Sequence, residues 1–195
     1  IRDRGVSAGA SLGAVIAIAL GFTSLGMFYM PAFAFVGAFV SVGITILLTL
    51  RNNKLDTTTL LLAGVAVSML LGAFTSGILT MINEYRLREF LFWMVGGLDF
   101  RRWDHVLLAV GPIMTGSVIL MMLGRHLNVL VLGDTEARAL GVPVMVYRML
   151  FLFLSSVITA TAVCVSGSIG FVGLVVPHIV RLLVGPDHRI LLPMA

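Results

Sequence analysis

The chain has 195 residues, of which 59% are hydrophobic and only 11% are charged. Soluble domains carry about 25% charged residues, so this chain has too few polar groups to cover a globular surface, and the composition excludes a water-soluble enzyme and a disordered chain. The formal net charge of +4 comes from arginines scattered between apolar runs rather than from a basic stripe, which favours membrane boundaries over a nucleic-acid partner.

Long gaps between charged residues define the candidate membrane spans. No Asp, Glu, Lys or Arg occurs in residues 5–50, 57–83, 105–124 or 149–180. A helix needs about 20 apolar residues to cross the hydrocarbon layer of roughly 30 Å. The first gap holds 46 residues and would be about 69 Å long as one helix, so it must fold back. Gly26 and Pro31 predict the turn at 23–31.

The predicted fold is all-α, a polytopic transmembrane helical bundle that forms a single domain over residues 1–195. We expect its spans, in chain order, at about 5–22, 31–50, 58–81, 105–124 and 146–166. The shorter apolar stretch 169–184 contains Pro177 and is predicted to be a sixth, kinked span or a re-entrant helix.

Small residues recur every four positions in two of these spans. The first stripe comprises Gly5, Gly9, Gly13, Ala17 and Gly21, and the second comprises Gly64, Ser68, Gly72, Ser76 and Thr80. Lipid gives helices no hydrophobic drive to associate, so such stripes predict close backbone packing, although the hydroxyls of the second could instead line a polar pathway. The fifth span also carries hydroxyls that we expect to bond to their own helix: Ser155, Ser156, Thr159, Thr161 and Ser166.

Loop charge predicts the orientation. Residues 51–56 are net basic and 125–148 carry an excess of arginine, whereas 82–104 are neutral. The positive-inside rule therefore places the first two segments in the cytoplasm and 82–104 outside. No acidic or basic residue lies deep in a span, which counts against an ion-coupled carrier.

The outside segment is predicted to contain a short interfacial helix. Its apolar residues fall on one helical face, and two tryptophans flank that face: Leu87, Phe90, Leu91 and Met94, with Trp93 and Trp103. This helix could cap the bundle, or it could form an outer gate or docking surface that presents Arg86, Arg88 and Glu89.

The cytoplasmic segment 133–143 encodes both ends of a short helix. Asp134 is predicted as its N-cap, Glu136 places negative charge in the first turn, and Gly141 and Pro143 end it. Isolated helices below about 12 residues are marginal in water, so this one is expected to press against its own bundle or against a second, soluble protein.

The sequence offers no recognisable catalytic or metal site. Its only lysine, Lys54, precedes Leu55, so the phosphate-binding loop of ATPases is absent from the sequence. Cys164 is the single cysteine, the histidines do not have metal-ligand spacings, and His178 is interpreted as a packing residue rather than a ligand. We therefore predict no cofactor and no ATPase site in the sequence, although a membrane enzyme could use groups that no motif reveals. That the chain is a transport subunit and not an enzyme is implied by the resemblance of residues 170–181, described next.

Residues 170–181 resemble the signature of FecCD-type permeases, through Gly170, Gly173, Pro177, His178 and Arg181. These BtuC-like proteins are membrane subunits of bacterial ABC importers for iron-siderophores, haem and vitamin B12. Three further stretches are similar to the same family: 5–10, 61–68 and 87–98. The resemblance implies a type II importer fold with ten helices per subunit in a dimer. This chain would supply about helices 3 to 8, so a fragment is expected.

The resemblance also implies roles and partners. The short cytoplasmic helix becomes the element that couples to a separate ATP-binding subunit, through Asp134, Thr135, Glu136, Ala137, Arg138, Ala139, Leu140 and Gly141. The span 58–81 would line the path at the axis of a homo- or heterodimer, and the outside segment would face a periplasmic or lipoprotein substrate-binding protein. The expected location is the bacterial inner membrane, and iron-siderophore is the favoured cargo.

Two other functions remain open on the sequence. One is a secondary transporter or channel with no ATPase partner, whose cytoplasmic helix packs only on its own bundle. The other is a membrane assembly subunit without a substrate path, which the glycine stripes alone would fit. Co-purification with an ATPase subunit and ATP-driven uptake would separate them.

Overall fold

The computed structural model describes residues 3–24, 26, 28–50, 57–97, 103–167, 172–185 and 188–194. All regular structure in these ranges is helical, which confirms the predicted all-α fold. The elements are α1 (Asp3–Ala19), η1 (Phe22–Ser24), α2 (Tyr29–Thr49), α3 (Thr57–Met81), α4 (Glu84–Val95), α5 (Trp103–Met122), α6 (Gly124–Val131), α7 (Asp134–Ala139), α8 (Val144–Ser166), α9 (Val172–Val184) and α10 (His188–Met194).

Four helices, α2, α3, α5 and α8, are long and apolar enough to cross a membrane, and α1 and α9 are apolar but shorter. Large hydrophobic side chains stay exposed along the four, among them Leu47, Leu62, Met69, Leu107 and Met122. Soluble monomers rarely expose so much contiguous apolar surface, whereas lipid solvates it. The chain is therefore a multi-pass membrane protein.

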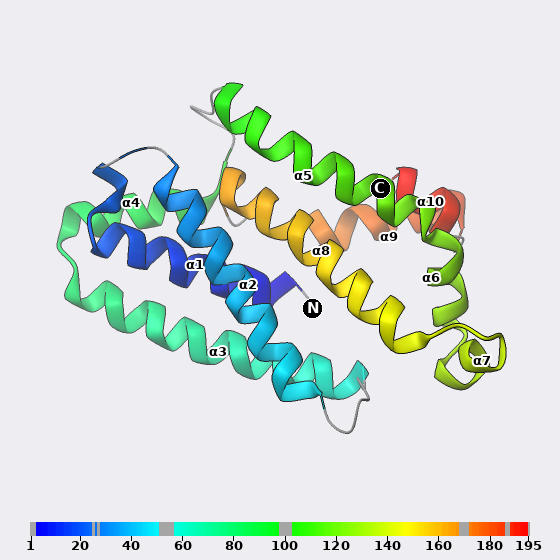
Figure 1. Cartoon of the computed structure of the whole chain (residues 1–195). Helices are drawn as coiled ribbons and strands as arrows, with labels where there is room; N and C mark the ends of the chain where they lie inside the picture. Colours follow the sequence, from blue (N-terminus) through cyan, green and yellow to red (C-terminus); the bar gives the residue numbers. More distant parts are fainter. Residues whose placement is uncertain are drawn as a thin grey trace.

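The helices form one bundle with a distinct element at each end (Figure 1). Helices α1, α2 and α3 pack on one another, α8 packs on α1 and α2, and α5 packs on α8. Helix α4 lies at one end of the bundle, and α6 and α7 lie at the opposite end. Helix α10 packs on α5, α6 and α9.

The first charge-free segment folds back, as its length requires. Helix α1 ends at Ala19, before the predicted residue 22, and Gly21 follows with a φ of 77°. Helix α2 already begins at Tyr29, so Pro31 lies in its first turn rather than in the connection. Proline is tolerated there because the first N–H groups of a helix have no partner within it.

Helices α1 and α2 touch backbone to backbone through the first glycine stripe. A Cβ on Gly9 would collide with the carbonyl oxygen of Gly37, and a Cβ on Gly13 would collide with that of Phe33. The Ser41 hydroxyl donates a hydrogen bond of 2.5 Å to the Gly5 carbonyl across the same interface. The close packing predicted for this stripe is therefore present. It occurs between α1 and α2, which follow one another in the sequence and run antiparallel.

The hydroxyls of α8 behave as expected for polar groups in a lipid-embedded helix. They donate to carbonyl oxygens of the preceding turn, in the pairs Ser155 to Phe151, Ser156 to Leu152, Thr161 to Val157 and Ser166 to Ala162. These bonds satisfy the donors without a partner on another helix.

Replacing Gly37 with alanine should destabilise the bundle. The new Cβ would collide with the Gly9 carbonyl and approach Gly13 within 3.1 Å. Overpacking of this kind typically costs about 1–3 kcal/mol, so the melting temperature in detergent should fall.

The matched control is Gly43→Ala on the same helix, where a Cβ meets nothing within 4 Å. Alanine is favoured over glycine in helices by up to about 1 kcal/mol, so this variant should melt at the same temperature or higher. Equal melting of both variants would contradict the close approach of α1 and α2.

Candidate functional site

The described ranges contain no group of three or more His, Cys, Asp or Glu side chains that could hold a metal ion. The features that can carry function are therefore surfaces and a groove. They are the short helix α7, the helix α4 at the opposite end, and the face that α3 presents beside a cavity.

Helix α7 starts differently from the prediction. Its N-cap is Gly133, with a φ of 125°, and Asp134 is the first helical residue, so the expected cap at Asp134 was wrong. A φ in this region favours glycine because it has no side chain to clash. The Glu136 carboxylate folds back against Gly133, whose carbonyl accepts the first helical bond from Ala137 N–H at 3.0 Å. Glycine is thus required at the entry to this helix.

The end of α7 follows the prediction. Gly141 has a φ of 76°, its N–H bonds the Arg138 carbonyl at 2.9 Å, and the Val142 N–H bonds the Ala137 carbonyl at 3.0 Å. This pair of bonds is a Schellman motif, which satisfies carbonyls that the helix end would otherwise leave free. Both ends of α7 are therefore fixed by local backbone geometry.

Helix α7 presents nearly all of its surface to the surroundings. Ala137 is fully buried and is its anchor on the bundle, where α6 and the start of α8 contact it. The other residues with described side chains are exposed: Thr135, Glu136, Arg138 and Ala139. Leu140, which follows the helix, is 64% exposed. An open depression of about 310 Å³ lies beside it, lined by Arg138, Val142, Pro143, Val144 and Met145.

A stacked ring pair joins α6 to α8 next to this helix. The His126 and Tyr147 rings have centroids 4.2 Å apart and planes within 14°, and Tyr147 continues to Phe151 at 6.4 Å. His126 Nδ1 is buried and makes no hydrogen bond within the described residues. The contribution of His126 to this joint therefore comes from ring stacking rather than from that nitrogen.

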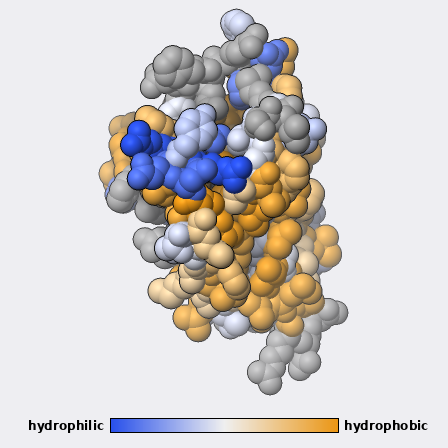
Figure 2. Space-filling view, turned by 90° about the vertical axis from the view of Figure 1, so that its left-hand side faces the viewer, coloured by the Kyte–Doolittle hydropathy of each residue, from blue (hydrophilic) through white to orange (hydrophobic). Residues whose placement is uncertain are grey.

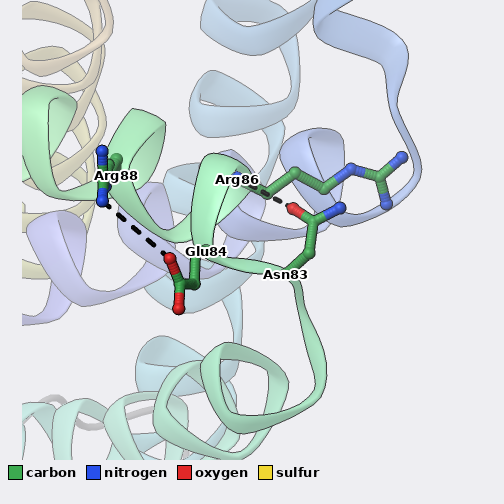
Figure 3. A network of polar contacts seen from close by, with 4 residues as sticks. All are labelled: Asn83, Glu84, Arg86 and Arg88. Carbon is green, nitrogen blue, oxygen red and sulfur yellow. Dashed lines mark hydrogen bonds and ion pairs between the residues drawn. The ribbon is translucent and has the colours of Figure 1, made fainter.

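Helix α4 is bound to the end of α1 by an arginine. Asn83 caps α4 by accepting a 3.0 Å bond from the Arg86 N–H (Figure 3). Arg86 Nη1 donates a 2.6 Å bond to the Ala19 carbonyl. The carbonyls at a helix C-terminus carry partial negative charge, so a guanidinium is stabilising there. Arg86 is thus engaged inside the chain.

The other end of α4 is bound to α8. The Gly97 N–H bonds the Ser166 carbonyl at 2.7 Å, and Gly167 ends α8 with a φ of 74°. A Cβ on Gly167 would collide with the carbonyl oxygen of Trp93. Helix α4 therefore connects the end of α1 to the end of α8.

Only part of the apolar surface of α4 packs on the rest of the chain. Phe90 and Trp93 are buried, whereas Leu91 and Met94 are 42% and 44% exposed. Arg86, Phe90 and Trp93 are spaced i, i+4 and i+7, so they lie on one side of the helix. This side of α4 therefore faces the described bundle.

The exposed surface of α4 includes one charged pair. Glu84 and Arg88 lie on the side of the helix away from Arg86, with Arg88 Nη2 and Glu84 Oε2 3.9 Å apart and both side chains largely exposed (Figure 3). The end of the molecule that carries α4 shows a hydrophilic patch next to hydrophobic surface (Figure 2).

The second small-residue stripe divides into two parts. Gly64 and Ser68 lie beside Gly5 of α1, with atoms 3.8 and 3.9 Å from a Cβ built on Gly5, so this part serves packing. Further along α3, a Cβ on Gly72 meets nothing within 4 Å, and Ser76 and Thr80 are exposed. One stripe thus has a packed part and an open part.

A cavity of about 120 Å³ opens between α1, α2, α3 and α8. Its polar lining consists of hydroxyls, Ser41, Thr45, Ser155, Ser156 and Thr159. The sequence prediction missed Ser41 and Thr45, although Ser41, Thr45 and Thr49 recur every four residues. Thr45 and Thr49 bond back along α2 at 2.9 and 2.7 Å.

The residues of the 170–181 stretch lie on or before α9. Gly170 falls outside the described residues, while Gly173 and Pro177 lie within the helix. His178 and Arg181 are exposed, so the packing role expected for His178 does not hold within the described structure.

Replacing Arg86 with methionine should release the start of α4 from α1. Hydrogen bonds to charged groups contribute about 1.5–3 kcal/mol, so the α4 amides should exchange with deuterium faster by one to two orders of magnitude. The matched control is Arg88→Met, because Arg88 is exposed and forms an ion pair with Glu84 at 3.9 Å on the surface of the helix. Equal exchange in both variants would show that Arg86 does not hold α4.

Comparison with known proteins gives one family. Residues 4–195 match the FecCD transport family. The cobalamin import system permease protein BtuC of Halobacterium salinarum is 44% identical over 192 residues, which cover 98% of this chain and 51% of that protein. The hemin transport system permease protein HmuU of Yersinia pestis is 42% identical over 197 residues, covering 98% and 58%. The molybdate import system permease protein MolB of Haemophilus influenzae is 36% identical over 191 residues, covering 97% and 56%.

A solved structure has the same fold. It is described as an inward-facing conformation of a metal-chelate type ABC transporter, and it matches with a TM-score of 0.91 and 33% identity over 98% of this chain and 60% of that chain. The present chain thus spans about half the length of the curated relatives it matches.

Proposed function

The chain belongs to the FecCD transport family, and from this premise we propose that it is the membrane-spanning core of an ABC importer permease. It works as one of two permease subunits, on which a separate ATP-binding subunit acts from the cytoplasm and a substrate-binding protein acts from outside. The observation that carries this proposal is α7, a helix capped at both ends and held by one buried residue, with its remaining surface open.

The orientation follows from charge at the two ends of the bundle. The segment with α6 and α7 carries Arg125, Arg138 and Arg148, which outnumber its acidic residues, and the segment with α4 is neutral. We assign the α7 end to the cytoplasm and the α4 end to the outside of a bacterial inner membrane.

Helix α7 is the contact for the ATP-binding subunit. An exposed leucine flanked by Glu136 and Arg138 supplies an apolar anchor with charges of both signs around it, as protein interfaces commonly have. The depression lined by Arg138 and Met145 extends this surface towards α8. A soluble partner seated here would bury Leu140 and stabilise a helix that is too short to stand alone.

Movement of α7 reaches the bundle through α6 and α8. The stack of His126 on Tyr147 couples α6 to the first turns of α8, and α8 borders the hydroxyl-lined cavity through Leu152, Ser155 and Thr159. When ATP closes the nucleotide-binding subunits, α7 moves with them, and the bundle tilts so that the pathway opens alternately to each side. The membrane chain supplies this motion and no chemistry.

The pathway itself lies along the open part of α3. Gly72, Ser76 and Thr80 face away from the other described helices, where a second permease subunit would complete the wall at the dimer axis. Small side chains and hydroxyls there would pass a bulky solute without holding it tightly. The substrate we propose is a metal chelate of the iron-siderophore, haem or cobalamin class, supported by relatives named for cobalamin and hemin import.

The substrate-binding protein docks over α4. Three charged residues are expected there, and the structure distinguishes them. Arg88 is exposed and pairs with Glu84, whereas Arg86 bonds the end of α1 and Glu89 is half-buried. We therefore assign direct contact to Arg88 and a supporting role to Arg86.

Reversing both charges on α7, with Glu136→Lys and Arg138→Glu together, should uncouple transport in the full-length importer. The partner's complementary charges would then face like charges, so uptake per ATP hydrolysed should fall about tenfold, which corresponds to about 1.4 kcal/mol. Uptake and ATPase rates are measured in the same proteoliposomes.

The control reverses the other exposed pair, Glu84→Lys with Arg88→Glu, at the opposite end of the bundle. This variant should keep its coupling ratio and lose affinity for the binding protein instead. If the charge reversal on α7 leaves uptake per ATP hydrolysed unchanged, α7 is not the contact for the ATP-binding subunit.

Replacing His126 with alanine should also lower uptake per ATP, because the ring joint between α6 and α8 is lost. His126→Phe should retain coupling, since phenylalanine can stack on Tyr147 and His126 Nδ1 has no hydrogen bond within the described residues to lose. Both variants should still co-purify with the ATP-binding subunit. If the phenylalanine variant is as impaired as the alanine variant, ring stacking is not the transmitting contact.

A further inference from the structure

A second cavity, of about 200 Å³, lies beneath α4 and has no part in the coupling or the pathway described above. Five regions of the chain form it: the α1–α2 connection with Thr23, the first turn of α2 with Met30 and Pro31, α4 with Glu89 and Trp93, the start of α5 with His105, and the end of α8 with Cys164. Its polar groups thus come from segments far apart in the sequence.

Trp93 lacks a hydrogen-bond partner in this cavity. Its side chain is only 7% exposed, and its Nε1 makes no hydrogen bond within the described residues. An indole N–H can only donate, and buried donors are nearly always paired with protein or ordered water. The acceptor for Trp93 must therefore be a molecule in the cavity or a group beyond the described residues.

The two kinds of polar group identify the occupant. The Trp93 N–H requires an acceptor, whereas the Glu89 carboxylate accepts when ionised. A bare cation would be repelled by the positive end of the N–H dipole, and an anion would be repelled by the ionised carboxylate. Water both accepts and donates, and the cavity greatly exceeds the roughly 10–15 Å³ that one water requires.

We propose that this cavity is a water-binding site, open to the solution on the α4 side, in which water accepts a hydrogen bond from Trp93 Nε1. The hydrated region reaches Cys164, two residues before α8 ends at Ser166. The side of α4 that carries Glu89 and Trp93 then contacts water in the cavity, while the two ends of α4 are bound to α1 and α8. This inference depends on the orientation given above and not on the transported substrate.

Cys164 is only 3% exposed, but it lines the cavity and is the only cysteine in the 195 residues, so its reactivity reports on access to this site. The full-length permease, with no other cysteine, is treated in intact cells with a small, charged methanethiosulfonate that does not cross membranes. We expect Cys164 to react at least tenfold faster than a control cysteine placed one turn earlier on α8, in the variant Cys164→Ala with Ala160→Cys. Ala160 is fully buried and does not line the cavity.

The control cysteine must react after unfolding in detergent, which shows that it is present and was protected by the fold. Equal protection of Cys164 and the control would overturn a hydrated cavity. Labelling of Cys164 only after the membrane is made permeable would instead overturn the orientation.

A second measurement addresses the hydrogen bond itself. Trp103 is 81% exposed, so Trp103→Phe leaves Trp93 as the only indole of the 195 residues with little structural change. Ultraviolet resonance Raman spectra should report a hydrogen-bonded indole N–H. A free N–H would overturn the assigned water contact, and a bonded N–H beside an unreactive Cys164 would identify a protein acceptor and equally overturn the proposal.

Discussion

Direct backbone contact between α1 and α2 is the constraint on which the rest of the structure depends. In lipid, apolar side chains give helices no reason to associate, so contact must come from close packing of the main chain. Gly9, Gly13 and Gly37 remove the side chains that would keep these helices apart. The α1–α2 pair then provides the surface on which α3 and α8 pack, and α8 in turn carries α5.

The two ends of this bundle are built on different physical contacts. At the α4 end, the Arg86 guanidinium bonds the C-terminus of α1, and the Gly97 N–H bonds the Ser166 carbonyl of α8. Helix α4 is thus attached to both helices. At the α7 end, a stacked ring pair and one buried alanine leave a small helix accessible. A bundle fixed at one end and accessible at the other is consistent with the proposed role, in which an ATP-binding subunit moves the chain from the cytoplasm.

The sequence predicted the features that depend on composition and spacing. Charge-free lengths indicated where helices such as α3 and α5 lie, since the bilayer excludes charge from their interiors. The glycine spacing predicted the α1 packing face, and Gly141 predicted the end of α7 from its backbone freedom. The pattern of 170–181 was sufficient to identify the family.

Features that depend on contacts between distant segments could not be predicted in this way. The side of α4 that faces the bundle carries Arg86, which bonds Ala19, 67 residues away in the sequence. Gly133 takes the cap position because the entering chain requires a positive φ, which no spacing rule reveals. The hydroxyls of Ser41 and Thr45 line a cavity only because α3 and α8 stand opposite them.

The most direct test of the account asks what α7 touches in the assembled importer. A photo-crosslinking amino acid in place of Leu140 is compared with the same amino acid in place of Tyr85, which is 79% exposed at the other end of the bundle. We predict a covalent adduct with the ATP-binding subunit from position 140 and none from position 85. An ATP-binding subunit that co-purifies but forms no adduct from position 140, or forms one from position 85, would contradict the account.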